Sequence, residues 1–347
     1  MVKSSFLFAL GAALVSAAPA PPVQVKAVVV AMFEIGEDTK DRAGEFQFWV
    51  EREKLDRVLP FAAGYHSLRS NADGSVLGIL TGQGVTNAAT SIMALGMDGR
   101  FDLSKAYWLV AGIAGVDPAD ASLGSAAWAN YVVDGDLVRE IDSREAPEEW
   151  PYARFALGAK RPNVLADRVT PENWQQMVFR LNPGLVEWAF DLTKDIKLED
   201  SPALSAFRQS YQFSPNAIKP PFVLKGDSLG ASTYWHGKVL TQWANDWVKL
   251  WTHGEGNFVM TNMEDNATAL ALRRLSLARR VDFNRVLFLR TASNFCMQAP
   301  GQSASASATA GYVGTAASLE AAYRVGSPVL HELVRNWSKW QNKIPGN

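Results

Sequence analysis

The chain has 347 residues, 48% of them hydrophobic, and its 34 basic and 35 acidic residues leave a net charge of −1. This length suits one large α/β domain or two smaller ones, and the balanced charge gives no reason to expect a nucleic-acid partner or an anionic membrane surface. The four histidines have no metal-ligand spacing with acids, so we predict no metal site. Cys296 is the single cysteine, which excludes an internal disulfide and is more typical of a small core residue than of a nucleophile.

The N-terminus predicts a secretory signal peptide over residues 1–18. Lys3 precedes an apolar run from Phe6 to Val15, and small residues follow up to Ala18. We therefore expect a secreted or cell-surface protein. The apolar run is too short to cross a bilayer, and no later stretch approaches the roughly 18 apolar residues that a spanning helix needs.

The first strand of the mature chain is expected over Val23 to Phe33, with its apolar part at 27–32. It leads into an acidic loop that contains Glu34 and Glu37. Acids directly after a strand are either ordinary loop residues or catalysts, and the pattern alone leaves both readings open.

The next two strands are each followed by small residues. Residues 77–81 form a strand that leads through Gly84 into a helix over residues 88–95, whose N-terminus could bind an anion or a sugar. The third glycine of the dinucleotide fingerprint is missing, so no nicotinamide cofactor is expected. Residues 107–111 form another buried strand, and Ala114 and Gly115 follow it where the backbone must approach a ligand or a packed helix closely.

Residues 126–133 are predicted to form a further strand. Residues 143–220 then carry little periodicity, and we interpret them as a partly helical insertion, with helices at 172–180 and 185–198. The mature chain, residues 23–347, is expected to be a single domain.

A strand at 222–225 leads into the sequence Gly-Asp-Ser-Leu-Gly at 226–230. Gly-x-Ser-x-Gly between a strand and a helix is the nucleophile-elbow pattern, so a serine esterase that uses Ser228 is one alternative. The residues that follow, 231–236, are not the small helix opening that such an elbow usually requires.

Polar residues follow two short apolar runs in the segment from Gly256 to Asn294. The first run ends at Asn262 and Glu264, and the second ends at Asn294. If both runs are buried parallel strands, these side chains meet at one edge of a sheet, where ligands of open α/β folds bind. Of the two glycosylation sequons, at Asn266 and Asn336, we favour Asn336, because a glycan at Asn266 would obstruct this edge. A small-residue loop at 302–307 is either a lid or a plain connection, and a helix is expected from 318 to about 340.

Six segments of the chain resemble, in order and spacing, the motifs of the nucleoside phosphorylase and nucleosidase superfamily, and most of all the fungal purine nucleoside permease family. These segments are residues 27–34, 82–95, 112–116, 226–227, 262–264 and 290–294. The resemblance implies an α/β fold, a three-layer sandwich around a central mixed sheet. It also implies a purine nucleoside as the small-molecule ligand and no cofactor, with phosphate as a possible co-substrate and a homo-oligomer as a possible assembly.

The resemblance assigns roles to individual residues. Glu264 would accept hydrogen bonds from two ribose hydroxyls, and Met263 would pack beneath the sugar. Asn294 would face purine N7, where an amide donates a hydrogen bond but transfers no proton. Supporting or substrate-contacting positions implied in the same way are Gly84, Ala114, Gly115, Asp227, Asn262, Arg290 and Ser293.

The chain departs from the phosphorylase pattern at Val110 and Ile113, where similar phosphorylases carry Arg and Ser that bind phosphate. Either phosphate is bound elsewhere, for instance by the loop at 36–42, or water attacks and Glu34 or Glu37 positions it. We therefore expect a protein that binds a purine nucleoside and cleaves its N-glycosidic bond. The alternative is a non-catalytic nucleoside-binding component that supports transport.

Overall fold

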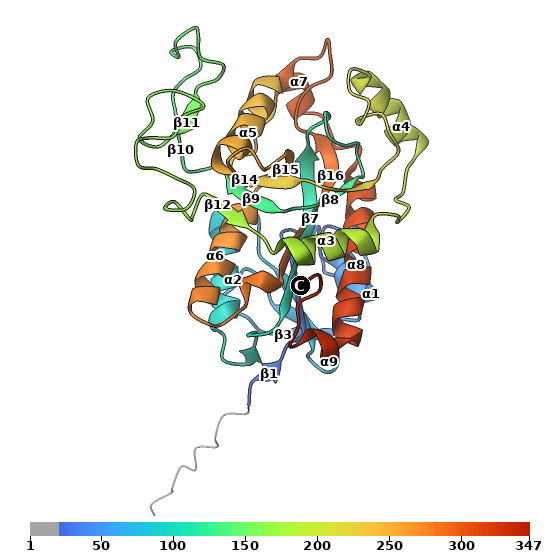
Figure 1. Cartoon of the computed structure of the whole chain (residues 1–347). Helices are drawn as coiled ribbons and strands as arrows, with labels where there is room; N and C mark the ends of the chain where they lie inside the picture. The colour runs from blue at the N-terminus through green and yellow to red at the C-terminus, as the bar shows by residue number, and fades with distance from the viewer. Residues whose placement is uncertain (1–20) are drawn as a thin grey trace, which may run out of the picture.

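The computed structural model describes residues 21–347, so the predicted signal peptide lies outside the described residues. A 12-stranded mixed sheet forms the centre of this part of the chain, and its main path runs β12-β9-β14-β15-β7-β2-β5-β4-β3 (Figure 1). Three strands lie off this path: β16 pairs with β7 and β8, and β8 pairs with β13. The strands of this sheet are β2 (Ala27–Ala31), β3 (Arg57–Leu59), β4 (Leu68–Ser70), β5 (Val76–Leu80), β7 (Tyr107–Val116), β8 (Ala126–Trp128), β9 (Tyr131–Asp134), β12 (Val178–Arg180), β13 (Val223–Lys225), β14 (Asp227–Gly230), β15 (Phe258–Asn262) and β16 (Val286–Phe295).

Two further pairs of strands lie outside the main sheet. They are β1 (Val23–Gln24) with β6 (Phe101–Asp102), and β10 (Val138–Glu140) with β11 (Arg154–Ala156). The helices are α1 (Gln47–Arg52), α2 (Val85–Met97), α3 (Pro183–Thr193), α4 (Pro202–Arg208), α5 (Lys238–Trp251), α6 (Asp265–Leu277), α7 (Ala304–Ala308), α8 (Thr315–Arg335) and α9 (Trp337–Trp340), with 3₁₀ turns η1 (Gln209–Tyr211) and η2 (Phe283–Arg285).

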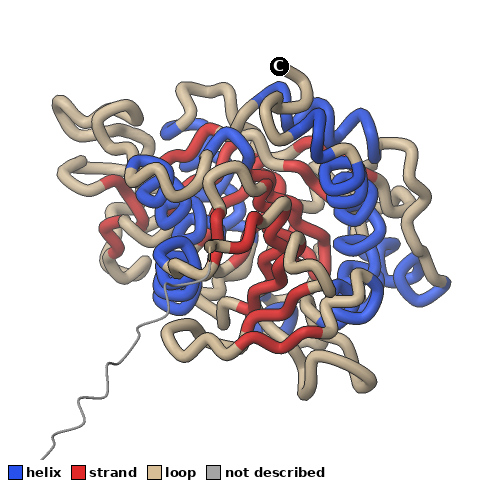
Figure 2. Tube along the Cα trace, turned by 90° about the horizontal axis from the view of Figure 1, so that it is seen from below, coloured by secondary structure: helices blue, strands red, loops and turns tan. Residues whose placement is uncertain are grey.

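The helices cover both faces of the central strands. In Figure 1, α2 and α6 lie on one side of β7, and α1 and α8 lie on the other. Figure 2 shows the same arrangement from below, with the strands between two groups of helices. The apolar run of β2 is buried along its whole length, as expected of a strand covered on both faces. The predicted α/β fold around a mixed sheet is therefore confirmed.

β7 and β16 are the two longest strands of the sheet, and both line the candidate functional site described below. They pair in parallel from Val286, opposite Trp108, to Phe295, opposite Val116. β15 pairs with β7 in the antiparallel direction, so β15 and β16 do not run parallel to each other as we expected. Their polar ends still meet, because Thr261 and Asn294 both lie opposite Gly115 of β7.

Two details of residues 126–225 differ from the prediction. The prediction of a helix at 172–180 is wrong. Val178–Arg180 forms β12, which pairs with β9, and Phe179 is buried. Pairing with an existing sheet edge satisfies the backbone there, whereas a short helix must first overcome the unfavourable cost of nucleating its first turn. The strand expected at 126–133 is two strands, because β8 pairs with β16 while β9 pairs with β14.

The small-residue segment at 302–307 is also more regular than expected. Ala304–Ala308 forms the short helix α7, and the Ser303 hydroxyl accepts a hydrogen bond from the Ala306 amide at its N-terminus. This helix ends before Tyr312, which reaches the ligand site described below. None of the helices formed by residues 21–347 is long and apolar enough to cross a membrane.

The two glycosylation sequons lie in different environments. The Asn266 side chain is buried in α6 and donates to Asp134 Oδ2 at 2.7 Å, so no glycan can be attached there without disrupting the helix. Asn336 is exposed at the end of α8. Glycosylation at Asn336 remains a prediction.

Candidate functional site

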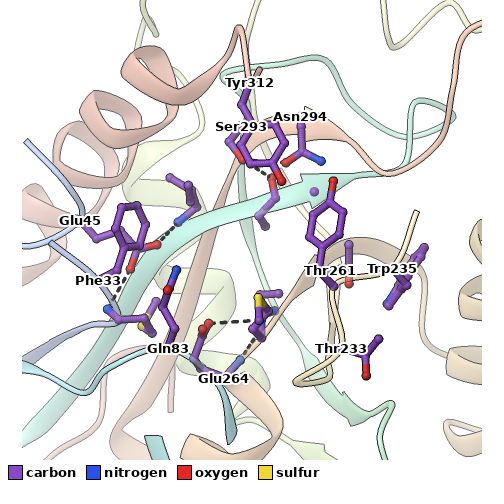
Figure 3. A pocket seen from close by; sticks show the side chains of 17 residues that line it. Phe33, Glu45, Gln83, Thr233, Trp235, Thr261, Glu264, Ser293, Asn294 and Tyr312 are labelled. Carbon is purple, nitrogen blue, oxygen red and sulfur yellow. Dashed lines mark hydrogen bonds between the residues drawn. The ribbon is translucent and has the colours of Figure 1, made fainter. Parts of the chain in front are cut away.

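A cavity of about 160 Å³ lies where β7, β15 and β16 meet the loops that follow β2 and β5. Figure 3 shows Glu45 and Glu264 on one side of this cavity and Asn294 on the other. The lining residues are Met32, Phe33, Glu45, Gln83, Ile113, Ala114, Gly115, Thr233, Tyr234, Trp235, Thr261, Asn262, Met263, Glu264, Ser293, Asn294 and Tyr312. Seven of the residues predicted for the site are therefore brought together here: Ala114, Gly115, Asn262, Met263, Glu264, Ser293 and Asn294.

Gly115 allows these side chains to converge. A Cβ atom at this position would lie 3.0 Å from Thr261 Cγ2 and 3.3 Å from Asn294 Nδ2, closer than ordinary side-chain contacts. The register of β16 against β7 shifts between Ala292 and Asn294, which is a β-bulge beside the cavity. Bulges of this kind redirect a side chain, and this one lies directly before Asn294.

Glu264 is 5% exposed and is held by three donors. Its Oε1 accepts from the Gly84 amide at 3.2 Å, and its Oε2 accepts from the Met263 amide at 3.2 Å and from Arg290 Nη2 at 3.4 Å. Burial raises the pKa of Glu264, and the neighbouring Arg290 guanidinium opposes that shift. Gly84 thus contributes to the site through its amide, which orients Glu264 from the N-terminus of α2.

Arg290 lies beneath the cavity, is fully buried, and forms ion pairs with the acids that surround it. It donates to Asp265 Oδ1 from Nη2 at 2.6 Å and from Nε at 3.0 Å, and to the Ile113 carbonyl at 3.0 Å. Burial alone lowers the pKa of Arg290, but Asp265 and Glu264 reverse this and raise it. Arg290 therefore stays charged and supports Glu264, the supporting position that the resemblance implied.

Asn262 and Ser228 complete the support beneath Glu264. The Asn262 side chain accepts from the Glu264 and Asp265 amides and donates to Ser228 Oγ at 2.6 Å. Ser228 in turn donates to Asp265 Oδ2 at 2.6 Å and is 1% exposed. Residues 227–230 form the strand β14 and not a turn between strand and helix, so the geometry gives the esterase hypothesis no support.

Asn294 is oriented by its neighbours. Its Nδ2 donates to the Phe295 carbonyl at 3.1 Å, and the Ser293 hydroxyl lies 2.9 Å from its Oδ1 and 3.0 Å from the Ala114 carbonyl oxygen. Ser293 is buried, whereas Asn294 is half-buried and faces the cavity. The amide is thus presented in a fixed orientation.

Five predicted site residues do not line the cavity: Gly84 and Arg290, which contact Glu264 from outside it, and Glu34, Glu37 and Asp227, which lie elsewhere. The Glu34 carboxylate accepts from the backbone amides of four residues, Ile35, Gly44, Phe46 and Gln47, and so anchors the start of α1. Glu37 is exposed on the surface. Asp227 accepts from the backbone amides of Asn130, Tyr131 and Asn257 at the start of β14, and burial raises its pKa to about 6.

Glu45 is the acid from the first loop that reaches the cavity, and the sequence analysis missed it. Its carboxylate accepts from the Met32 amide at 2.8 Å and the Ile113 amide at 2.7 Å, and it lies 3.9 Å from Arg290 Nη1. Burial raises the pKa of Glu45 to about 7, which Arg290 partly opposes. A Cβ atom at Gly112 would lie 2.5 Å from Glu45 Oε1, so this glycine was the sequence signal that something approaches closely there. We call Glu45, Glu264, Asp265 and Arg290 the charged floor.

Two aromatic side chains that were also not predicted line the side of the cavity opposite these charged residues. Tyr234 and Tyr312 have ring centroids 6.3 Å apart and planes inclined by 22°, and they are 43% and 41% exposed. We call these two tyrosines the aromatic rim. They come from segments without secondary-structure periodicity, after β14 and after α7, so nothing local in the sequence paired them.

The fold is similar to that of solved 5'-methylthioadenosine/S-adenosylhomocysteine nucleosidases, as the nucleoside phosphorylase-like prediction implied. The chain is similar to the Helicobacter pylori 5'-methylthioadenosine/S-adenosylhomocysteine nucleosidase, with a TM-score of 0.54 at 12% identity, over 90% of this chain and 99% of that one. It is also similar to the futalosine hydrolase of the same species, with a TM-score of 0.52 at 12% identity, over 89% and 98% of the two chains.

The chain belongs to the purine nucleoside permease family, whose model matches residues 24–345. It is 32% identical to a probable purine nucleoside permease of Schizosaccharomyces pombe over 80% of each chain. It is 31% identical to a purine nucleoside permease of Candida albicans, over 91% of this chain and 76% of that protein. The family named by the resemblance is confirmed.

Proposed function

We propose that this protein binds a purine nucleoside in the cavity, with the sugar against Glu264 and the base against Asn294, as a component of nucleoside uptake. One observation carries the proposal: a buried, oriented carboxylate and an oriented amide line the same cavity from opposite sides. The names of the permease relatives support the ligand class. The predicted signal peptide would place the binding site outside the plasma membrane.

Glu264 suits the sugar. An ionised carboxylate is an acceptor only, and it can take hydrogen bonds from two adjacent hydroxyls at once. The Gly84 and Met263 amides and Arg290 fix its position, so little side-chain freedom is lost when a sugar binds. Met263 and Ile113 supply apolar contacts beside it.

Asn294 and the aromatic rim suit the base. An amide has both a donor and an acceptor, so it can bond to the N7 edge of purines with a 6-oxo or a 6-amino group. Tyr234 and Tyr312 line the same cavity as Asn294, where aromatic contact with a planar base adds affinity.

Hydrolytic cleavage of the nucleoside is a second candidate, and Glu45 favours it. A carboxyl with a pKa near 7 exists in both protonation states at neutral pH, which is the condition for a general base that activates water. Among the described residues that line the cavity there is no Lys or Arg to hold phosphate. Water is therefore favoured over phosphate as the attacking group, in agreement with the apolar Ile113 at the phosphorylase position.

Incubation of the purified mature protein with inosine, guanosine and adenosine, with and without phosphate, tests both candidates. Saturable binding measured by calorimetry with no product supports the uptake role. Free ribose that appears without phosphate supports hydrolysis, and ribose 1-phosphate would contradict the preference for water. Failure of all three nucleosides to bind at millimolar concentration would refute the proposal.

A further inference from the structure

A smaller compartment of about 30 Å³ adjoins the cavity on the side of Asn294. The cavity and this compartment share four lining residues: Ser293, Asn294, Tyr234 and Tyr312. A group bound beside Asn294 therefore lies next to both spaces. We call this compartment the side pocket. Its volume has room for about two water-sized groups, which is the size of an exocyclic substituent and not of a second ring.

Aromatic side chains form one wall of the side pocket. Phe207, Tyr211 and Phe295 pack on one another, with centroids 4.0 Å apart for Tyr211 and Phe295 and 6.4 Å apart for Phe207 and Phe295. The Tyr211 hydroxyl donates to the Met297 carbonyl and is therefore already bonded. These three rings offer flat apolar contact.

His236 lines the side pocket, and its ring nitrogens are the unusual feature. Both are buried, and neither has a hydrogen-bond partner among residues 21–347. The other three histidines each have one: His66 contacts the Ser67 carbonyl, and His253 and His331 contact Glu172 and Glu53. Buried polar atoms are nearly always paired, so an unpaired imidazole beside a ligand cavity indicates that a ligand group completes it.

Burial lowers the pKa of His236, so its imidazole is neutral at neutral pH. A neutral imidazole has one N–H donor and one nitrogen acceptor, and the two tautomers exchange these positions. It can therefore donate to an exocyclic oxygen or accept from an exocyclic amino group.

We propose that the side pocket is a subsite for the exocyclic group on C6 of the purine, and that His236 is a specificity-determining residue that hydrogen-bonds to it. This inference rests on the proposed function, since it places the base beside Asn294. On a purine, C6 adjoins the ring that carries N7, so a base held by Asn294 at N7 directs its 6-substituent past Asn294. The side pocket begins there.

The test compares three ribosides that differ at C6, inosine with an oxygen, adenosine with an amino group, and purine riboside with hydrogen; inosine also carries a proton on N1. We expect the wild-type protein to bind inosine and adenosine with similar affinity and purine riboside about tenfold more weakly, the size of one neutral hydrogen bond. In His236→Phe, which keeps a ring of similar shape, the preference over purine riboside should fall to about onefold. His331→Phe is the control, because His331 lies on α8 away from the cavity, and it should keep the wild-type ratios.

Each outcome decides the matter. An unchanged preference in His236→Phe would overturn the inference, as would an equal loss of affinity for all three ribosides, which a merely structural role would produce. Wild-type protein that binds none of the ribosides would overturn the proposed function together with the inference, whereas binding without a C6 preference would overturn only the role of His236.

Discussion

The charged floor and the aromatic rim lie across one cavity and are built in opposite ways. Every member of the floor is nearly or fully buried, and each is held by several hydrogen bonds or ion pairs at 2.6–3.9 Å. The two rim tyrosines are more than 40% exposed and are stacked mainly on each other. A ligand therefore meets groups already in place on the floor, whereas the rim can adapt. We expect the floor to govern stability and sugar binding, and the rim to contribute only to affinity.

The largest effect should follow from the substitution Arg290→Met. Three buried carboxylates then lose their shared positive charge, and breaking a buried ion pair from one side typically costs about 3–5 kcal/mol. Urea denaturation should show this loss in the free energy of unfolding. Arg144→Met removes an exposed pair with Asp142 and should leave the free energy of unfolding nearly unchanged. Equal effects of the two substitutions would contradict the structural role of the floor.

Glu45 should make stability depend on pH. Its pKa is about 7 in the folded protein against an ordinary value of 4.5, so between these pH values the folded protein holds the proton that the unfolded chain has lost. The contribution of Glu45 to the free energy of unfolding is thus full below about pH 4.5 and falls as pH rises to 7, by at most about 3 kcal/mol. Denaturation at pH 5 and pH 8 should show a smaller decrease for Glu45→Gln than for wild type. The same decrease in both proteins would show that another group causes it.

Glu264→Gln should weaken the binding of inosine about 10- to 100-fold, because hydrogen bonds to a carboxylate are stronger than those to a neutral amide. Calorimetric titration measures the change, and circular dichroism shows whether the fold is kept. Glu37→Gln removes the same charge from an exposed position and should bind like wild type. Wild-type affinity in Glu264→Gln would refute its role at the sugar.

The smallest effect should come from the rim. Tyr312→Ala removes an aromatic face beside the base and should weaken inosine binding about three- to tenfold. The free energy of unfolding should change by no more than about 1 kcal/mol, because the residue is 41% exposed and lies outside the hydrophobic core. If stability falls by several kcal/mol instead, the rim is part of the folded core and the contrast with the floor is lost.

Much of the fold and part of the site could be predicted from local sequence patterns. The apolar runs within β2, β5, β7, β15 and β16 were recognisable as strands, and those of β15 and β16 are followed by polar residues, which is why Glu264 and Asn294 were expected at strand ends. The direction of β15 relative to its neighbours could not be predicted. A buried apolar strand has the same sequence pattern in a parallel pair as in an antiparallel pair. Glu45 was missed for a different reason: it lies thirteen residues beyond Met32, and only tertiary folding returns its carboxylate to the Met32 amide.

Tyr234 and Tyr312 could not be paired from sequence either, since 77 residues separate them and neither lies in a helix or strand. Asp227 was predicted as a site residue but does not line the cavity. It matched a motif, but its carboxylate is occupied by three backbone amides at the beginning of β14, where its role is to join strands.

Glu34 holds the backbone of residues 44, 46 and 47 through its carboxylate, and Glu45 lies between these residues. The position of Glu45 in the cavity therefore depends on Glu34, which lies outside the cavity. Replacing Glu34 with alanine would release the segment and displace Glu45, and a screen based on activity alone would then count Glu34 as a ligand-contacting residue. A double substitution separates the two cases: if Glu34 acts only through Glu45, its loss should add little to the functional defect of Glu45→Gln.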